Sequence, residues 1–236
     1  RSSDLDDWAE SISVPQADSL DFKDDGSIPW IFDADDDSNS FGNIEIVQNL
    51  FLNPTLFALF ANTFSEGHTN PLLRTPLSRW PKAFSEAADS LIKCPSCKMT
   101  YDYKNRNEGQ FACPFCGKKR PRILIAESFF GETEKPLNLF VREIDEQTIF
   151  LPSRVFEPFR VFRGDENIIS ISIKDEKIEF RALEDDNPIC ISKNGEAEKI
   201  IAGQRFQFNM PKGELPFFQL RYKKAPKRKV LISFKG

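Results

Sequence analysis

We expect a mainly β protein with an N-terminal helical part, because three patterns follow one another along the 236 residues. Apolar residues recur at helical spacing through residues 43–92. Two Cys-x-x-Cys pairs follow in residues 93–122, and short alternating runs fill residues 123–236. These patterns predict a helical hairpin, a four-Cys zinc ribbon and a C-terminal β-sandwich.

The segment before the hairpin, residues 1–42, is rich in aspartate and poor in apolar side chains. Such a composition cannot bury a core of its own, so we expect an acidic, partly irregular and solvated segment. Trp30, Ile31 and Phe32 interrupt the acidic pattern, and we expect them to anchor the segment on the helices that follow.

The composition also bounds the compartment. The chain has a net charge of −4, no signal peptide and no apolar run long enough to span a bilayer. We therefore expect a cytoplasmic protein, where cysteines stay reduced. The chain begins at Arg1 with no Met, which indicates a fragment of a longer protein.

The first helix is predicted to open at Pro54, with Asn53 as its cap, because proline suits the first turn and asparagine accepts from the free N–H groups. Its apolar face contains Leu56, Leu59, Phe60 and Phe64, and we expect Gly67 to end it. A second helix is predicted from an apolar stripe of Leu77, Trp80, Phe84, Ala87, Ala88 and Leu91.

The two Cys-x-x-Cys pairs carry the clearest chemistry in the chain. They are Cys94 with Cys97 and, fifteen residues later, Cys113 with Cys116. Four thiolates at this spacing predict a Zn²⁺ site, and four protein ligands leave no position for water or substrate. The metal would therefore be structural. The alternative is a pair of disulfides, which we disfavour because nothing else in the chain is typical of secretion.

Basic residues surround the predicted ribbon, and aromatic residues lie among them. Lys and Arg in residues 93–122 outnumber the acidic residues, and Tyr101, Tyr103 and Phe115 are interleaved with them. This combination is compatible with single-stranded nucleic acid. We favour a solubilising surface around a metal staple, since the whole chain is acidic.

Residues 123–236 contain about nine short strands separated by turn signals such as Asn194-Gly195, with no helix expected between them. This pattern predicts a two-sheet, Ig-like β-sandwich. A forkhead-associated-like sandwich is the alternative, because residues 201–206 resemble its later strands, although its Gly-Arg and Ser-x-x-His signatures are missing. Cys190 is expected to be a buried, inert thiol.

Two charged features of the sandwich are candidates for recognition. Loop carboxylates on a rigid scaffold are typical contact residues, and here they are Asp165, Glu166, Glu184, Asp185 and Asp186. The last strands are basic, with Arg221, Lys227, Arg228 and Lys229 among their residues. These cations could contact an anion, or they could prevent an edge strand from pairing with other molecules. We favour the second interpretation.

A longer pattern joins the helices to the ribbon. It comprises Asn53-Pro54-Thr55-Leu56, Phe60, Phe64, Asn70-Pro71-Leu72-Leu73-Arg74 and Trp80, running directly into Cys94. In this order, residues 28–122 resemble the end of the C-lobe of bacterial serine/threonine kinases of the tellurite-resistance type, which continue into a Cys-x-x-Cys ribbon. The sequence departs from that family at Arg74, where Thr75 separates the arginine from Pro76.

The resemblance implies a non-catalytic, regulatory end of a kinase, because the chain lacks every catalytic motif of that family. It has no Gly-rich phosphate loop, no strand lysine, no His-Arg-Asp and no Asp-Phe-Gly. The family further implies two partners, a von Willebrand A-domain protein and a PP2C-type phosphatase. We expect one of the loop carboxylates to complete the Mg²⁺ site of the A domain. A nucleic-acid-binding ribbon and a phosphopeptide-reading sandwich are the alternatives.

Overall fold

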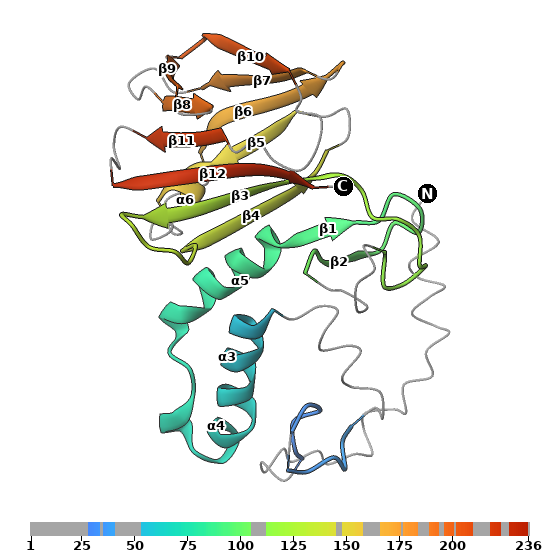
Figure 1. Ribbon diagram of the computed structural model, residues 1–236. Coiled ribbons are helices and arrows are strands. Elements are labelled where there is room, and N and C mark those ends of the chain that lie inside the picture. The colour runs from blue at the N-terminus through green and yellow to red at the C-terminus, as the bar shows by residue number, and fades with distance from the viewer. Residues whose placement is uncertain are drawn as a thin grey trace, which may run out of the picture.

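The computed structural model describes residues 28–33, 35–40, 53–104, 112–144, 148–157, 166–175, 177–183, 189–193, 196–200, 202–209, 218–222 and 227–235. Within these residues, the protein is mainly β with a few short helices (Figure 1). A helical hairpin lies on one side of two larger sheets. A small two-stranded sheet lies where the helical hairpin meets these larger sheets (Figure 1).

The helical hairpin begins where the sequence predicts. Helix α3 spans Pro54–Phe64, and the Asn53 side chain accepts from Leu56 N at 2.7 Å. Short turns follow, and α5 spans Trp80–Asp89. The turns are α4 (Glu66–Thr69), η2 (Pro71–Leu73) and η3 (Leu77–Arg79). Leu56, Leu59, Ala83 and Ala87 form the small core between α3 and α5.

Three details of the hairpin differ from the prediction. Gly67 does not end the first helix, which stops at Phe64, and it lies buried within α4. The second helix begins at Trp80 because Pro81 fits only its first turn. Leu77 therefore lies outside the helix and is 86% exposed. Leu91 belongs to a strand rather than to the apolar stripe.

Two aromatic residues anchor part of the acidic segment on α3, as predicted. The Trp30 ring lies 5.8 Å from Phe57 and 6.2 Å from Phe64, and Phe32 lies 6.4 Å from Phe57. The rest of the predicted acidic segment, apart from residues 28–33 and 35–40, lies outside the described residues.

The described residues between Ile123 and Lys235 form two antiparallel sheets (Figure 1). The six-stranded sheet has the order β4-β3-β12-β11-β8-β9, and the four-stranded sheet has the order β10-β7-β6-β5. The strands of the first sheet are β3 (Ile123–Phe130), β4 (Asn138–Glu143), β8 (Ile189–Lys193), β9 (Glu196–Ile200), β11 (Phe218–Tyr222) and β12 (Arg228–Lys235). Those of the second are β5 (Ile149–Pro152), β6 (Asn167–Lys174), β7 (Lys177–Ala182) and β10 (Arg205–Asn209).

The two sheets enclose one apolar core. Buried side chains from both sheets form a single cluster, in which Phe180 of β7 lies 4.9 Å from Phe218 of β11. The two described sheets therefore pack against each other as a sandwich, with ten described strands where about nine were expected. The additional strand is β9, whose sequence Glu-Ala-Glu-Lys-Ile shows little apolar alternation. A short helix, α6 (Ser153–Phe156), interrupts the series where none was expected.

The basic C-terminal strands lie in the middle of the six-stranded sheet. Strand β12 pairs with β3 on one side and β11 on the other, and β11 also pairs with β8. Neither strand is an edge strand. The predicted edge guard is therefore wrong, and these cations need a different explanation.

Candidate metal centre

Two short loops bring the four predicted cysteines together. Cys94 and Cys97 lie in the turn between β1 (Leu91–Lys93) and β2 (Thr100–Asp102). Cys113 and Cys116 lie in a second turn, which an isolated bridge between Ala112 and Lys119 closes.

The two turns have the same local geometry. In the first, Lys98 N donates to Cys94 O at 3.0 Å, and in the second Gly117 N donates to Cys113 O at 2.9 Å. Lys98 and Gly117 both have positive φ, 65° and 67°. Each residue directly follows the second cysteine of its pair, so the chain reverses in the same way twice. Glycine adopts this left-handed backbone without strain, which explains its place after Cys116.

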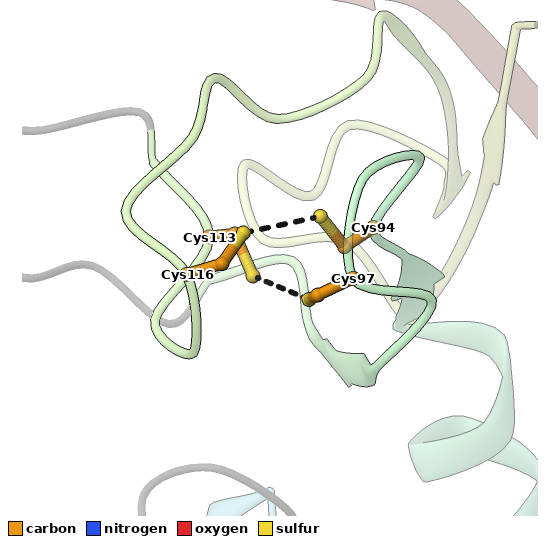
Figure 2. Close-up of side chains that lie close together, drawn as sticks. All are labelled: Cys94, Cys97, Cys113 and Cys116. Carbon is orange, nitrogen blue, oxygen red and sulfur yellow. Dashed lines mark hydrogen bonds between the residues drawn. The ribbon is translucent and has the colours of Figure 1, made fainter.

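The four sulfur atoms face one another across the two turns (Figure 2). All four lie within 4.8 Å of one another. Cys94 Sγ lies 3.7 Å from Cys116 Sγ, and Cys97 Sγ lies 3.7 Å from Cys113 Sγ. A disulfide would require about 2.05 Å, so the cysteines are not bridged. This cluster could hold a metal ion.

The thiols of the cluster differ in their acidity. Burial opposes ionisation of Cys94, but the backbone N–H groups of Cys97 and Ser96 lower the pKa of this thiol to about 6. Burial raises the pKa of Cys113 to about 12. Without a bound cation, only some of the four thiols are therefore ionised at the same time. A divalent metal ion would supply the positive charge that allows several sulfurs to ionise together.

The buried side of the cysteine cluster packs against the outer face of the six-stranded sheet. Cys94 and Cys113 are buried in one cluster with Ile92 and Tyr101 of the small hairpin. The same cluster contains three residues of the six-stranded sheet: Ile123, Ile125 and Val141. The metal centre and the sandwich thus share a core, while Cys97 and Cys116 lie nearer the surface.

A second set of contacts joins α5 to the sandwich beside this centre. The fully buried Asp89 carboxylate accepts from Arg154 Nε at 2.8 Å and from Arg154 Nη2 at 2.7 Å. Arg142 Nη2 lies 3.3 Å from the same carboxylate. Burial lowers the pKa of Arg142 although Asp89 opposes this effect. This ion cluster was not predicted, because Asp89 follows Ala88 in an ordinary helical stripe and its partners lie over fifty residues away.

The chain connections around Ser90 reinforce the same junction. Ser90 Oγ donates to Asp102 Oδ2 at 2.7 Å, and Tyr103 N donates to Ser90 O at 3.0 Å. Lys93 N donates to the Glu143 carboxylate of β4. Helix α5, the small hairpin and the sandwich are therefore connected by polar contacts as well as by a shared core.

Of the five predicted partner-binding carboxylates, the structure describes only Glu166. Glu166 is exposed, and its backbone oxygen accepts from Ser153 N at 2.8 Å. Asp165, Glu184, Asp185 and Asp186 lie outside the described residues. Cys190 is half-buried in β8 instead of fully buried, and it lies apart from the metal cluster.

These features define a β-sandwich protein with a four-cysteine candidate metal centre and a helical hairpin. No known protein family, curated protein or solved structure matches the chain. Among the described residues, no helix combines the length and apolar character needed to cross a membrane.

Proposed function

We propose that the four cysteines bind one structural Zn²⁺ ion. A tetrahedral zinc site with Zn–S bonds of about 2.3 Å places its sulfurs about 3.8 Å apart. The Cys94 Sγ–Cys116 Sγ and Cys97 Sγ–Cys113 Sγ distances are both 3.7 Å. Four thiolates saturate the metal and leave no open position for a substrate, which is the arrangement of a zinc ribbon and not of a catalytic zinc.

We further infer that the chain is a non-catalytic interaction region. The observation that supports this best is the shared core between the metal centre and the sandwich, which involves Cys94, Cys113, Ile123, Ile125 and Val141. A metal in this position fixes one part of the fold against another. A scaffold of this kind presents loops and surfaces at fixed positions, and recognition is the function that such surfaces usually serve.

Within this function, the chain would be the C-terminal part of a bacterial serine/threonine kinase of the tellurite-resistance type. The hairpin supports this proposal, because Leu72 is 92% exposed and Leu77 is 86% exposed. Exposed apolar residues of this size are expected where a hairpin packs against more protein. Arg74 is already engaged, since its Nε donates to Gly67 O at 2.7 Å. An additional carboxylate contact would have to use its remaining donors.

The proposed partners are a von Willebrand A-domain protein and a PP2C-type phosphatase. A carboxylate from Asp165, Glu166, Glu184, Asp185 or Asp186 would complete the Mg²⁺ coordination of the A domain, because Mg²⁺ prefers oxygen ligands. The exposure of Glu166, next to the start of β6, supports this contact.

A pull-down with a purified von Willebrand A-domain protein tests the proposal. Binding is expected with Mg²⁺ and is expected to disappear with EDTA while zinc stays bound, which metal analysis must verify because zinc loss would unfold the ribbon. Alanine at all five carboxylates should abolish binding. Alanine at Glu132 and Glu134, exposed residues of the β3–β4 turn, is the matched control. If the variant with all five alanine substitutions still binds the A-domain protein, the proposed contact is contradicted.

A phosphopeptide-reading sandwich is the second candidate, and the strand order favours it. An Ig-like sandwich has seven or nine strands, whereas this one has ten described strands divided six and four. The order β4-β3-β12-β11-β8-β9 opposite β10-β7-β6-β5 is similar to that of forkhead-associated domains, which read phosphorylated peptides. Equal affinity for a phosphothreonine peptide and its unphosphorylated form would exclude this candidate.

A further inference from the structure

The outer face of the four-stranded sheet contains a row of residues that crosses all four strands (Figure 1). Phe150 of β5 is directly opposite Ser170 of β6. Arg181 of β7 is opposite Ser170 on one side and opposite Arg205 of β10 on the other. The chain neighbours of these residues belong to the sandwich core, so the row itself lies on the outer face. We call these four residues the transverse row.

The transverse row places an exposed aromatic ring near two exposed cations. Phe150 is 46% exposed, and Arg181 and Arg205 are both exposed. Ser170 is small, so no bulky side chain of the row stands between the ring and Arg181. Adjacent strands lie about 4.8 Å apart, so the backbones of Phe150 and Arg181 are separated by about 10 Å. The face therefore has an apolar end and a cationic end within reach of one small ligand group.

The charges on this face favour an anionic ligand. Arg181 and Arg205 are like charges directly opposite each other, an arrangement that destabilises a sheet unless another group compensates it. Glu179 faces the same side, and its carboxylate lies 3.7 Å from Arg205 Nη1. Lys174 and Lys177 are exposed on this face as well. The described strands thus place four cations and one carboxylate here, and a bound anion would offset the excess.

The exposed ring of Phe150 distinguishes between classes of anion. Single-stranded nucleic acid carries both phosphates and free bases, so it can use arginines and an aromatic ring together. An acidic peptide would use only the cations, and the bases of a duplex are already stacked on one another. The ribbon is a less suitable surface for the same ligand, because Tyr101 is only 1% exposed and cannot stack on a base.

We propose that the outer face of the four-stranded sheet binds single-stranded nucleic acid across its strands. A base stacks on Phe150, and phosphates contact Arg181 and Arg205. Arginine suits this role because its planar guanidinium donates two hydrogen bonds to one phosphate. This binding is a further activity and does not depend on the partner docking proposed above. Because it releases counterions from the phosphates, it weakens as the salt concentration rises.

Fluorescence anisotropy of a labelled oligo-dT strand tests the base contact in the full chain. Phe150→Ala should weaken binding about tenfold, because it removes one stacking platform. Phe150→Trp keeps an aromatic ring at this position and should retain the affinity. Phe130→Ala is the matched control and should leave the affinity unchanged, because this ring is 44% exposed but lies in the six-stranded sheet.

A second pair of variants tests the phosphate contact. Arg181→Gln should weaken binding of oligo-dT several-fold and reduce the slope of log affinity against log salt by about one. Arg221→Gln, which changes an exposed arginine of the six-stranded sheet, should change neither quantity.

An abasic strand of the same length separates the two kinds of contact, because it keeps the phosphates and lacks the bases. It should bind more weakly than oligo-dT and should not distinguish Phe150→Ala from the unmodified protein. Equal affinity for the abasic strand and oligo-dT would show a surface that binds any polyanion and would overturn the proposal. Absence of oligo-dT binding at low salt, or unchanged affinity in Phe150→Ala or Arg181→Gln, would overturn it as well.

Discussion

Asp89 shows how much one residue contributes to the arrangement of this protein. It is the last residue of α5, and its carboxylate is fully buried between Arg154 and Arg142. A buried carboxylate is tolerated only when it is paired and hydrogen-bonded, and the two-atom contact with Arg154 satisfies this condition. The pair therefore fixes the end of α5 on the sandwich.

We predict that Asp89→Asn strongly destabilises the protein. Removal of one partner from a buried ion pair costs about 3–5 kcal/mol, because the remaining charge is left uncompensated. Urea unfolding would measure this loss. Glu86→Gln in the same helix is the control, since its pair with Lys82 lies at the surface and contributes less than about 1 kcal/mol. A similar effect of both variants would contradict the role of Asp89.

The two kinds of site residue differ in what the sequence can predict. The four cysteines were predicted because metal-ligand spacing is a local property, and each pair closes its own turn. Asp89 and its two arginines were not, because their charges meet only after the chain has folded. The predicted recognition carboxylates remain predictions, since only Glu166 lies within the described residues.

At the scale of elements, Gly67 holds the tip of the helical hairpin together. A Cβ atom at this position would lie 2.6 Å from the Asn62 backbone oxygen and 2.9 Å from Arg74 Cγ. The absence of a side chain lets Arg74 fold over the turn and donate to the carbonyls of Gly67 and His68. The glycine serves close packing here and does not end a helix.

Gly67→Ala should therefore loosen the hairpin. Forcing an extra methyl group into a packed position costs about 1–3 kcal/mol, and here the nearest atom is backbone that cannot rotate away. Hydrogen exchange of α3 and α4 amides would detect the loss locally. Ala88→Ser, on the exposed side of α5, should leave those amides unchanged. Unchanged protection in Gly67→Ala would show that the turn can rearrange.

Element boundaries followed the sequence only where local chemistry decides them. The Asn53 cap and Pro54 set the start of α3 as predicted. Strand β9 was missed because its polar sequence takes its strand conformation from pairing with β8. The position of β11 and β12 in the sheet was also mispredicted, since strand order depends on contacts between distant segments.

At the scale of the whole molecule, the metal centre should determine the stability of more than its own ribbon. Its core includes residues of β3 and β4, so unfolding of the ribbon exposes Ile123, Ile125 and Val141. Exposure of this apolar surface to water also reduces the stability of the sandwich.

Zinc removal should therefore lower the melting temperature of the whole sandwich. Cys113→Ser is expected to cost at least about 3 kcal/mol, a fraction of the roughly 10–16 kcal/mol that structural zinc contributes in small domains. Scanning calorimetry with metal analysis would measure both quantities. Cys190→Ser, which leaves the cluster intact, should cost less than about 1 kcal/mol. If the melting temperature of the sandwich does not change when zinc is removed, its stability does not depend on the metal centre.

The junction between α5 and the small hairpin has a consequence for partner choice. Helix α5 ends at Asp89 and β1 begins at Leu91, so a single residue separates them (Figure 1). Because no flexible linker separates them, the exposed Leu72 and Leu77 of the helical hairpin are held at a fixed distance from the sandwich. A long linker would let partners of many sizes engage both ends. A partner that engages both ends, as proposed above, would therefore have to match the fixed distance between them.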